Sequence, residues 1–151
     1  MSTRYIVAVD GSDAGWKAMD MAVRLAGEAE AELIVVHVVP YEPVPDAIEQ
    51  WARTEGMSGG EIGARFHQDR AIADGIIREA GRRAREAGMD DVTFKAPEGS
   101  VAKELVNMAS DYEAEMIFLG SRGLSDLQGM LLGSVSHKVT ERAGCTCITV
   151  R

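Results

Sequence analysis

The sequence predicts a single α/β domain, residues 1–151, built on a doubly wound parallel sheet of five strands with four main helices. Three observations support this fold class. The length of 151 residues suits one domain with one core. Five short apolar segments rich in β-branched residues are typical of buried strands. Segments with helical spacing separate them, and this alternation favours parallel strands joined by right-handed crossovers.

The five expected strands are continuous apolar runs, with one exception. The third alternates apolar and polar residues, which predicts a strand at the edge of the sheet with one exposed face. The expected strands are Tyr5–Val9, Leu33–Val39, Val92–Ala96, Glu115–Gly120 and Cys145–Val150.

Each expected helix begins or ends at a recognisable signal. A turn over Asp10–Asp13 starts the first, whose buried stripe we expect at Ala18, Met21, Ala22, Leu25, Ala26 and Ala29. The second covers 61–87 and stops before Gly88, and its expected stripe is Ile72, Ile76, Ala80, Ala84 and Ala87. Ser100 caps the third, and the fourth runs from about Ser134 to Arg142. Residues 40–60, with three prolines and three glycines, are expected to form a long loop.

Composition and charge exclude several classes of function. The net charge is −8 and the pI about 4.9, so tight non-specific binding of nucleic acid or anionic lipid is not expected. The first apolar run is too short for a signal-peptide core or a membrane span, so we expect a cytoplasmic protein that is not an integral membrane protein. Two cysteines are too few for a disulfide scaffold.

The clearest local pattern runs from Gly120 to Ser136, directly after the fourth expected strand. Glycines let backbone N–H groups approach phosphate oxygens, and the helix that follows adds a favourable partial charge at its N-terminus. Ser134 either caps this helix or offers its hydroxyl to a phosphate, and Arg122 and Lys138 add positive charge nearby. The alternative is an ordinary loop followed by a capped helix.

Asp10 is the second candidate, because it ends the first expected strand. A carboxylate at that place accepts hydrogen bonds from ribose hydroxyls. The alternative is an Asp that caps the first helix.

Together these segments resemble the universal stress protein family. Val7–Ser12 is similar to the family's opening strand and turn, and Val35–Pro40 to its second strand. The spacing Gly120, two residues, Gly123, nine residues, Gly133, Ser134 is similar to that of the ATP-binding members. The resemblance covers the chain from Tyr5 to Val150.

The resemblance implies a strand order of 3-2-1-4-5 and a homodimer that pairs through strand 145–150. It also implies an ATP site, with Mg²⁺ possible alongside the phosphates. In it, backbone near Val9 and Val38 would hold adenine, Asp10 would bind ribose, and the remaining site residues would line the path of ribose and phosphates. These are Leu119, Gly120, Gly123, Gly133, Ser134, Val135 and Ser136.

The other notable residues favour structural roles. Cys145 and Cys147 lie two apart in an expected strand and so share one face, where small buried residues are expected. His37 is expected to be a hydrogen-bonded core histidine. His137 lies either near the phosphates or in solvent.

Three functions are compatible with this reading. The sequence contains no P-loop, no G-x-G-x-x-G after the first strand and no nucleophile elbow. The resemblance implies an ATP-binding stress-response or regulatory protein, and the absence of these motifs favours one that is not primarily an enzyme. A weak ATPase and a nucleotide-independent interaction module remain as alternatives.

Overall fold

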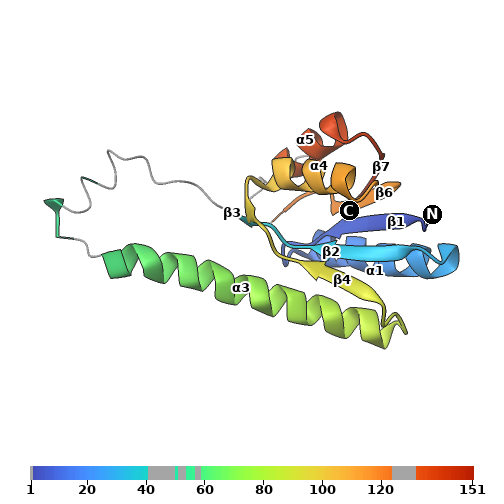
Figure 1. The fold of residues 1–151 in the computed structure, drawn as a ribbon, viewed down its shortest axis with the longest axis horizontal. Helices are drawn as coiled ribbons and strands as arrows, with labels where there is room; N and C mark the ends of the chain where they lie inside the picture. Colours follow the sequence, from blue (N-terminus) through green and yellow to red (C-terminus); the bar gives the residue numbers. More distant parts are fainter. Residues whose placement is uncertain (1, 41–49, 51–53, 57–58, 124–131) are drawn as a thin grey trace.

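A computed structural model describes residues 2–40, 50, 54–56, 59–123 and 132–151, with the backbone alone for 59–68. Its elements alternate between strands and helices along the chain (Figure 1). In chain order they are β1 (Arg4–Ala8), α1 (Asp13–Ala29), β2 (Glu32–Val36), β3 (Val39–Pro40), α3 (Gly59–Glu86), β4 (Val92–Lys95), β5 (Glu98–Gly99), α4 (Val101–Asp111), β6 (Met116–Gly120), α5 (Ser134–Arg142) and β7 (Thr146–Val150).

The main sheet has the order β4-β2-β1-β6-β7, and all its strands are parallel. Counting these five strands along the chain gives 3-2-1-4-5, so the expected fold class and strand order are confirmed. The alternating strand, β4, lies at an edge as predicted. The expected strands begin or end up to three residues from the observed ones, which is the usual uncertainty at element ends.

A second sheet, of β3 paired with β5, was not predicted. Each strand has only two residues, too few to produce a periodic pattern in the sequence. The Val39 N–H donates to the carbonyl of Pro97 at 2.8 Å. This small sheet continues the chain beyond the end of β2 and ties it to the segment after β4.

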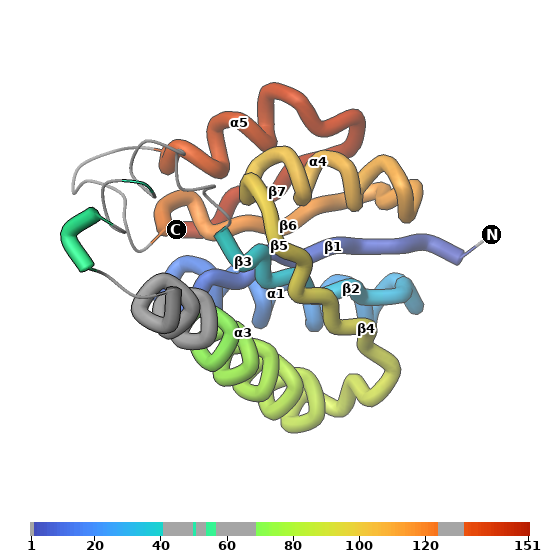
Figure 2. The backbone as a smooth tube through the Cα atoms, turned by 60° about the vertical axis from the view of Figure 1, so that its left-hand side comes forward, coloured from blue at the N-terminus to red at the C-terminus, as the bar shows by residue number. Residues whose placement is uncertain are grey.

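Helices cover both faces of the main sheet, as Figure 2 shows. On one face α1 and α3 pack over Tyr5, Val7, Val35 and Phe118. On the other face α4 and α5 pack over residues that alternate with these along the strands, among them Ile6, Ile34, Val36 and Ile117. The strands are therefore apolar on both faces, which explains their continuous apolar runs.

The buried stripes of two helices differ from the expected ones. In α1 the buried residues are Gly15, Ala18, Met19, Ala22, Val23 and Ala26, while Met21 and Leu25 are only partly buried. In α3, Ala73, Ala80 and Ala84 are buried, but Ile72 is 52% exposed and Ala87 is exposed. Alanine spacing fits more than one helix face, so the larger apolar residues misled the sequence-based assignment.

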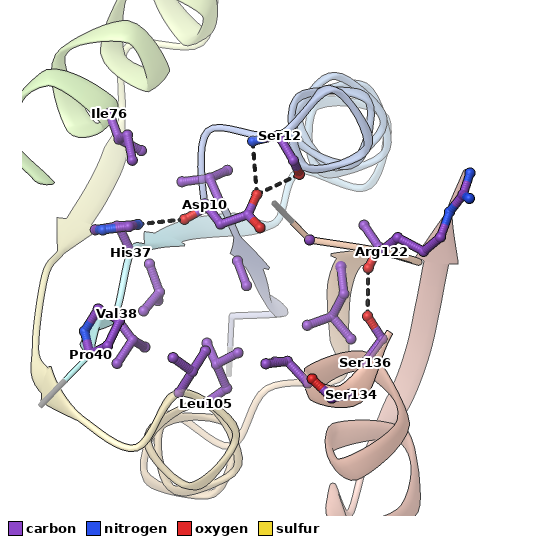
Figure 3. A pocket seen from close by; sticks show the side chains of 18 of the residues that line it. Asp10, Ser12, His37, Val38, Pro40, Ile76, Leu105, Arg122, Ser134 and Ser136 are labelled. Atoms are coloured by element: carbon purple, nitrogen blue, oxygen red, sulfur yellow. Dashed lines mark hydrogen bonds between the residues drawn. The ribbon is translucent and has the colours of Figure 1, made fainter. Parts of the chain in front are cut away.

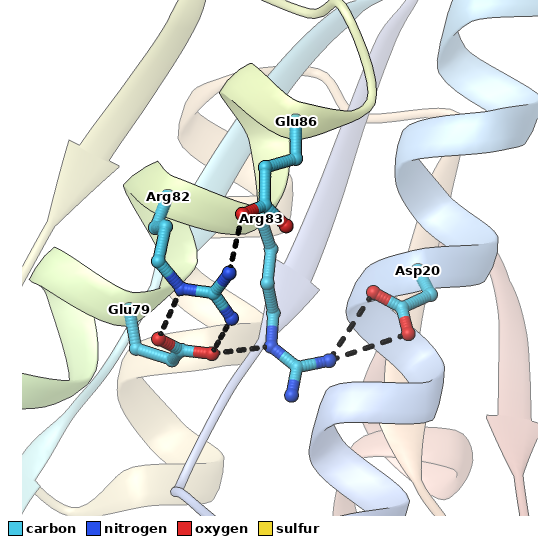
Figure 4. Close-up of polar contacts among 5 residues, drawn as sticks. All are labelled: Asp20, Glu79, Arg82, Arg83 and Glu86. Carbon is cyan, nitrogen blue, oxygen red and sulfur yellow. Dashed lines mark hydrogen bonds and ion pairs between the residues drawn. The ribbon is translucent and has the colours of Figure 1, made fainter.

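Two arginines hold α3 in place, one at each side of its middle. Arg83 forms an ion pair with Asp20 of α1 at 3.3 Å, and its guanidinium lies 4.8 Å from the centroid of the Trp16 ring. Figure 4 shows the ion pair between Arg83 and Asp20 beside Glu79. The pKa of Glu79 falls to about 2 because Arg82 and Arg83 donate hydrogen bonds to its carboxylate. Towards the other end of α3, Arg70 donates to the carbonyl of Ala96 and to the Glu98 carboxylate of β5.

Helix ends follow the sequence signals closely. Ser12 is the N-cap of α1, and its hydroxyl accepts from the Gly15 N–H. Ser100 is the N-cap of α4 as predicted, although its hydroxyl makes no capping hydrogen bond. Gly88 follows the end of α3 at a φ of 80°, a conformation that glycine adopts without strain. Among the helices of the described residues, none is long and apolar enough to cross a membrane.

Candidate functional site

A pocket of about 320 Å³ lies at the carboxyl ends of β1, β2 and β6. In a parallel sheet this edge is where the loops that bind ligands gather. Figure 3 shows Asp10 between His37 and Val38 on one side and Ser134 and Ser136 on the other. The lining also includes Ala8, Val9, Ser12, Val36, Pro40, Asp69, Ile72, Ile76, Val101, Leu105, Leu119, Gly120, Arg122, Gly123 and Val135.

Nine of the ten residues predicted for the site line this one pocket. The tenth, Gly133, is the N-cap of α5, directly before the lining residues Ser134 to Ser136. Part of the predicted loop, residues 124–131, lies outside the described residues. The structure thus brings the predicted residues together, while their role towards a nucleotide stays a prediction.

Asp10 shapes the turn into α1 through its side chain. Its Oδ1 accepts hydrogen bonds from the Ser12 N–H at 2.9 Å and from the Ser12 hydroxyl at 2.5 Å. Ser12 in turn caps the helix, so the alternative that Asp10 itself is the capping residue is wrong. Its second oxygen, Oδ2, accepts no hydrogen bond from the described residues, and this leaves it available on the pocket wall.

Gly120 is needed for packing as well as for its place in the pocket. A Cβ at this position would lie 2.8 Å from the Ala14 carbonyl carbon and 2.8 Å from the Gly15 nitrogen, both backbone atoms of α1. A Cβ on Gly15 would lie 2.8 Å from Asp10 Oδ1. The two glycines therefore let the start of α1 approach the ends of β1 and β6. Sequence reasoning missed Gly15, although a glycine three residues after a capping serine was the available signal.

The N-terminus of α5 opens towards the pocket without a capping side chain. Gly133, and not Ser134 as one reading of the sequence had it, is the N-cap, and α5 has no acidic residue in its first turn. Ser136 is buried and donates its hydroxyl hydrogen to the Gly120 carbonyl at 2.6 Å, which fixes α5 against the end of β6. The first N–H groups of a helix have no partner within the helix, and the helix dipole adds positive potential there.

The end of β2 offers backbone groups to the opposite side of the pocket. The N–H groups of His37 and Val39 donate to the carbonyls of Lys95 and Pro97. Val38 lies between them, and neither its N–H nor its C=O takes part in the backbone hydrogen bonds of the described residues. Around it Val36, Leu105 and Leu119 form an apolar wall.

His37 is a buried, hydrogen-bonded histidine, as predicted, with 8% of its surface exposed. Its Nδ1 lies 2.8 Å from the carbonyl oxygen of Val9. It also lines the pocket, which the sequence analysis did not foresee because a histidine within an apolar strand gives no sign of where its second nitrogen points.

The other polar residues considered from the sequence contribute less. Arg122 lines the pocket, but Figure 3 shows its guanidinium directed away from the centre. Lys138 and His137 are exposed and do not line it, so the solvent-facing alternative holds for His137. Sequence reasoning missed the wall that α3 supplies through Asp69, Ile72 and Ile76. The helical spacing of Ile72 and Ile76 was visible, but it was interpreted as part of a buried stripe, and Asp69 was not considered.

Cys145 and Cys147 lie on the same face, against α5, as their spacing predicted. Both are partly buried rather than fully buried. Burial raises the pKa of both thiols, so little of either is the reactive thiolate at neutral pH. The described residues include no group of three His, Cys, Asp or Glu side chains that could hold a metal ion.

Solved structures of known proteins share the fold described above. The solved structure of the universal stress protein UspA from Lactobacillus plantarum has a TM-score of 0.83 over 99% of this chain and 97% of that one, at 22% identity, which shows the shared fold. A universal stress protein solved in complex with cAMP has a TM-score of 0.66, at 29% identity over 99% of this chain and 96% of that one.

Sequence comparison shows the family directly. The universal stress protein YxiE of Bacillus subtilis is 34% identical over the whole length of both chains. The model of the universal stress protein family matches residues 1–151. With the strand order, the pocket at the carboxyl edge and the spaced glycines in agreement, this chain belongs to the universal stress protein family.

Proposed function

We propose that this protein binds ATP in the pocket described above and acts as a nucleotide-responsive regulatory protein of the stress response. One observation carries the proposal. The same pocket has an apolar wall at one side, beside Val38, whose N–H and C=O make no backbone hydrogen bond within the described residues. At its other side lies the N-terminus of α5, which has no side-chain cap. An adenine nucleotide has matching chemistry, with a flat base at one end and phosphates at the other.

The base would lie beside Val38. Adenine carries a hydrogen-bond acceptor at N1 next to a donor at its 6-amino group, and the N–H and C=O of one residue can pair with both. Val36, Leu105 and Leu119 supply apolar contact for the ring. Most of the surface of ligand pockets is apolar in this way, with a few polar groups that fix orientation.

The ribose would lie at Asp10, in the middle of the pocket. Because Ser12 occupies only Oδ1 of this carboxylate, Oδ2 can accept a hydrogen bond from a ribose hydroxyl. The contact from Ser12 also holds the carboxylate in one orientation, which lowers the entropy lost on binding.

The phosphates would lie at the first turn of α5, against the backbone of Ser134, Val135 and Ser136. Helix N-termini bind anions because their free N–H groups and the helix dipole act together. Mg²⁺, where it takes part, would arrive with the phosphates. The neighbour that binds cAMP supports an adenine nucleotide here, since cAMP shares the base, the ribose and a phosphate with ATP. The spacing of Gly120, Gly123 and Gly133 supports ATP in particular.

The test is a calorimetric titration of nucleotide-free protein with ATP, with and without Mg²⁺, alongside Ser134→Asp and Ser134→Asn. Ser134 is exposed and begins α5, so both replacements fit, and they differ only in charge. We expect the parent to bind and the Asp variant to lose at least about tenfold in affinity relative to the Asn variant, because like charges repel near the phosphates.

Each other result has a definite meaning. No binding of ATP by the parent contradicts the proposal and favours the nucleotide-independent interaction module. Equal affinities for the two variants would place the phosphates away from α5. Steady phosphate release during the titration would favour the weak ATPase.

We also propose that a second copy of the chain pairs with β7. This strand bonds to β6 on one side only and forms an edge of the sheet. Edge strands with free backbone groups are natural sites for such pairing. The backbone groups of Thr146 and Val150 bond to residues at the two ends of β6, so by the alternation of a strand the N–H of Thr149 faces the open edge. Sedimentation equilibrium should give twice the chain mass for the parent and the monomer mass after Thr149→Pro, since proline cannot donate to a strand across the interface.

A further inference from the structure

The pocket holds one nearly buried polar side chain with an unused hydrogen-bonding atom, and this is His37. The residue is only 8% exposed and lines the pocket. Its Nδ1 is 2.8 Å from the Val9 carbonyl oxygen. A carbonyl oxygen can only accept, so Nδ1 carries the hydrogen and donates.

This bond fixes what the other ring nitrogen can do. In the neutral ring only one nitrogen carries hydrogen, so Nε2 is a hydrogen-bond acceptor. No described residue donates to Nε2. Among the described residues, the one fully buried side-chain polar atom without a partner is the hydroxyl of Ser121, so Nε2 still has accessible surface. His37 is a lining residue of the pocket, and we take the accessible edge of its ring to face it.

From this geometry we infer that His37 Nε2 accepts a hydrogen bond from an amino group on the base, so that the pocket selects 6-aminopurines over 6-oxopurines. His37 directly precedes Val38, the residue whose backbone groups are unpaired. The 6-amino group of adenine has two N–H bonds, one for the Val38 carbonyl and one for His37. A 6-oxo group would instead place an oxygen lone pair against two acceptors, which costs binding free energy.

Ile72 and Ile76 of α3 make this contact more discriminating. Both line the pocket, and Figure 3 shows Ile76 on the same side of it as His37. Apolar side chains offer a base no alternative hydrogen bond, and they limit the water that could replace a missing one. A site built to pair with an N–H group rejects an analogue that lacks it, because its own acceptor is then left unpaired.

The experiment compares ATP with purine riboside triphosphate, which has hydrogen in place of the amino group, and with inosine triphosphate, which has oxygen. This inference rests on the proposed nucleotide binding, and calorimetry on the parent protein tests the two separately. We expect the parent to bind ATP best and inosine triphosphate worst. The deciding quantity is the ratio of affinities for ATP and purine riboside triphosphate, since a general loss of binding cancels in that ratio.

His37→Asn removes the acceptor while keeping the structural hydrogen bond. The Asn amide can still donate to the Val9 carbonyl, but no atom remains near the position of Nε2. We expect the affinity ratio to fall by roughly three- to tenfold, the size of one neutral hydrogen bond. His37→Gln carries its amide one bond further out, near the position of Nε2. It should keep more of the ratio but unfold at a lower temperature, because the Val9 carbonyl loses its donor.

His137→Asn is the matched control, since His137 is exposed on α5 and does not line the pocket. Its ratio should equal that of the parent. If the parent binds ATP but does not distinguish it from purine riboside triphosphate, the inference is wrong and the proposed function stands. The inference is equally wrong if His37→Asn keeps the parent ratio. If the parent binds no ATP, both the inference about His37 and the proposed function are wrong.

Discussion

The helices α1 and α5 both begin at the carboxyl edge of the sheet, yet their N-termini are built in opposite ways. At α1, Ser12 caps the first turn, Asp10 holds Ser12, and Asp13 adds an acidic side chain. At α5 the N-cap is Gly133, and the first turn has neither a capping side chain nor an acidic residue. The N-terminus of α1 is thus satisfied by its own side chains, whereas that of α5 has no capping side chain, as the proposed phosphate site requires.

The difference teaches that a helix N-terminus at a sheet edge is not by itself a phosphate site. What matters is whether nearby side chains already use its N–H groups and its dipole. At α1 those groups stabilise the fold, and at α5 we propose that they serve a ligand. Substitutions at α1 should therefore change stability first, whereas the charge added at Ser134 should change ligand affinity first.

The largest effect on stability is expected from Gly120→Ala. The new Cβ would lie 2.8 Å from two backbone atoms of α1, which cannot move without displacing the helix. We expect a loss of about 1–3 kcal/mol in the free energy of unfolding, typical of overpacking. Urea denaturation measures it.

Gly27→Ala, within α1, is the control for the previous substitution. Nothing lies within 4 Å of a Cβ built at Gly27, so this change should stabilise the protein by about 0.5–1 kcal/mol through helix propensity alone. An unchanged stability in Gly120→Ala would show that α1 can shift away from β6, and the close contact would then not define the start of α1.

A smaller effect is expected from Ser12→Ala, which removes the cap of α1. The Gly15 N–H loses its partner, and Asp10 Oδ1 loses one of its two hydrogen bonds but keeps the one from the Ser12 N–H. The expected loss is about 1 kcal/mol in the free energy of unfolding. Ser100→Ala is the matched control, because Ser100 is also an N-cap but its hydroxyl makes no capping bond. If thermal unfolding gives the same loss of stability for Ser12→Ala and Ser100→Ala, the hydrogen bond from Gly15 to Ser12 does not stabilise the start of α1.

Much of the fold was predictable because its signals are local and repeated. Continuous β-branched runs identify the buried strands, and the alternating run at Val92–Lys95 identifies the edge strand. The two-residue strands β3 and β5 have no such signal. The buried face of α1 was assigned about one residue out of phase, because an alanine-rich helix leaves the choice to packing against β6 and β1.

Part of the candidate site was likewise predictable from local signals, and part was not. The residues at the end of β1, and those from β6 to α5, belong to two short segments with recognisable patterns. His37, Asp69 and Ile76 join the pocket through tertiary contacts, and no spacing in the chain records these contacts. The sequence likewise suggested that glycine at 120 serves a ligand, whereas the structure adds the close approach of α1.

The contacts of Arg70 and Arg83 determine how α3 could move relative to the pocket. Arg83 attaches the helix to α1, and Arg70 attaches it to β5, with Ile72 and Ile76 between them. The part of α3 that lines the pocket is thus attached at two points, Arg70 and Arg83. These lie about 20 Å apart along the helix at 1.5 Å per residue. Without the Arg70 contacts, α3 would still be held near Arg83, where Ala80 and Ala84 are buried in the core. A swing of the helix about Arg83 would move Asp69 about twice as far as Ile76, because Asp69 lies twice as many residues from Arg83.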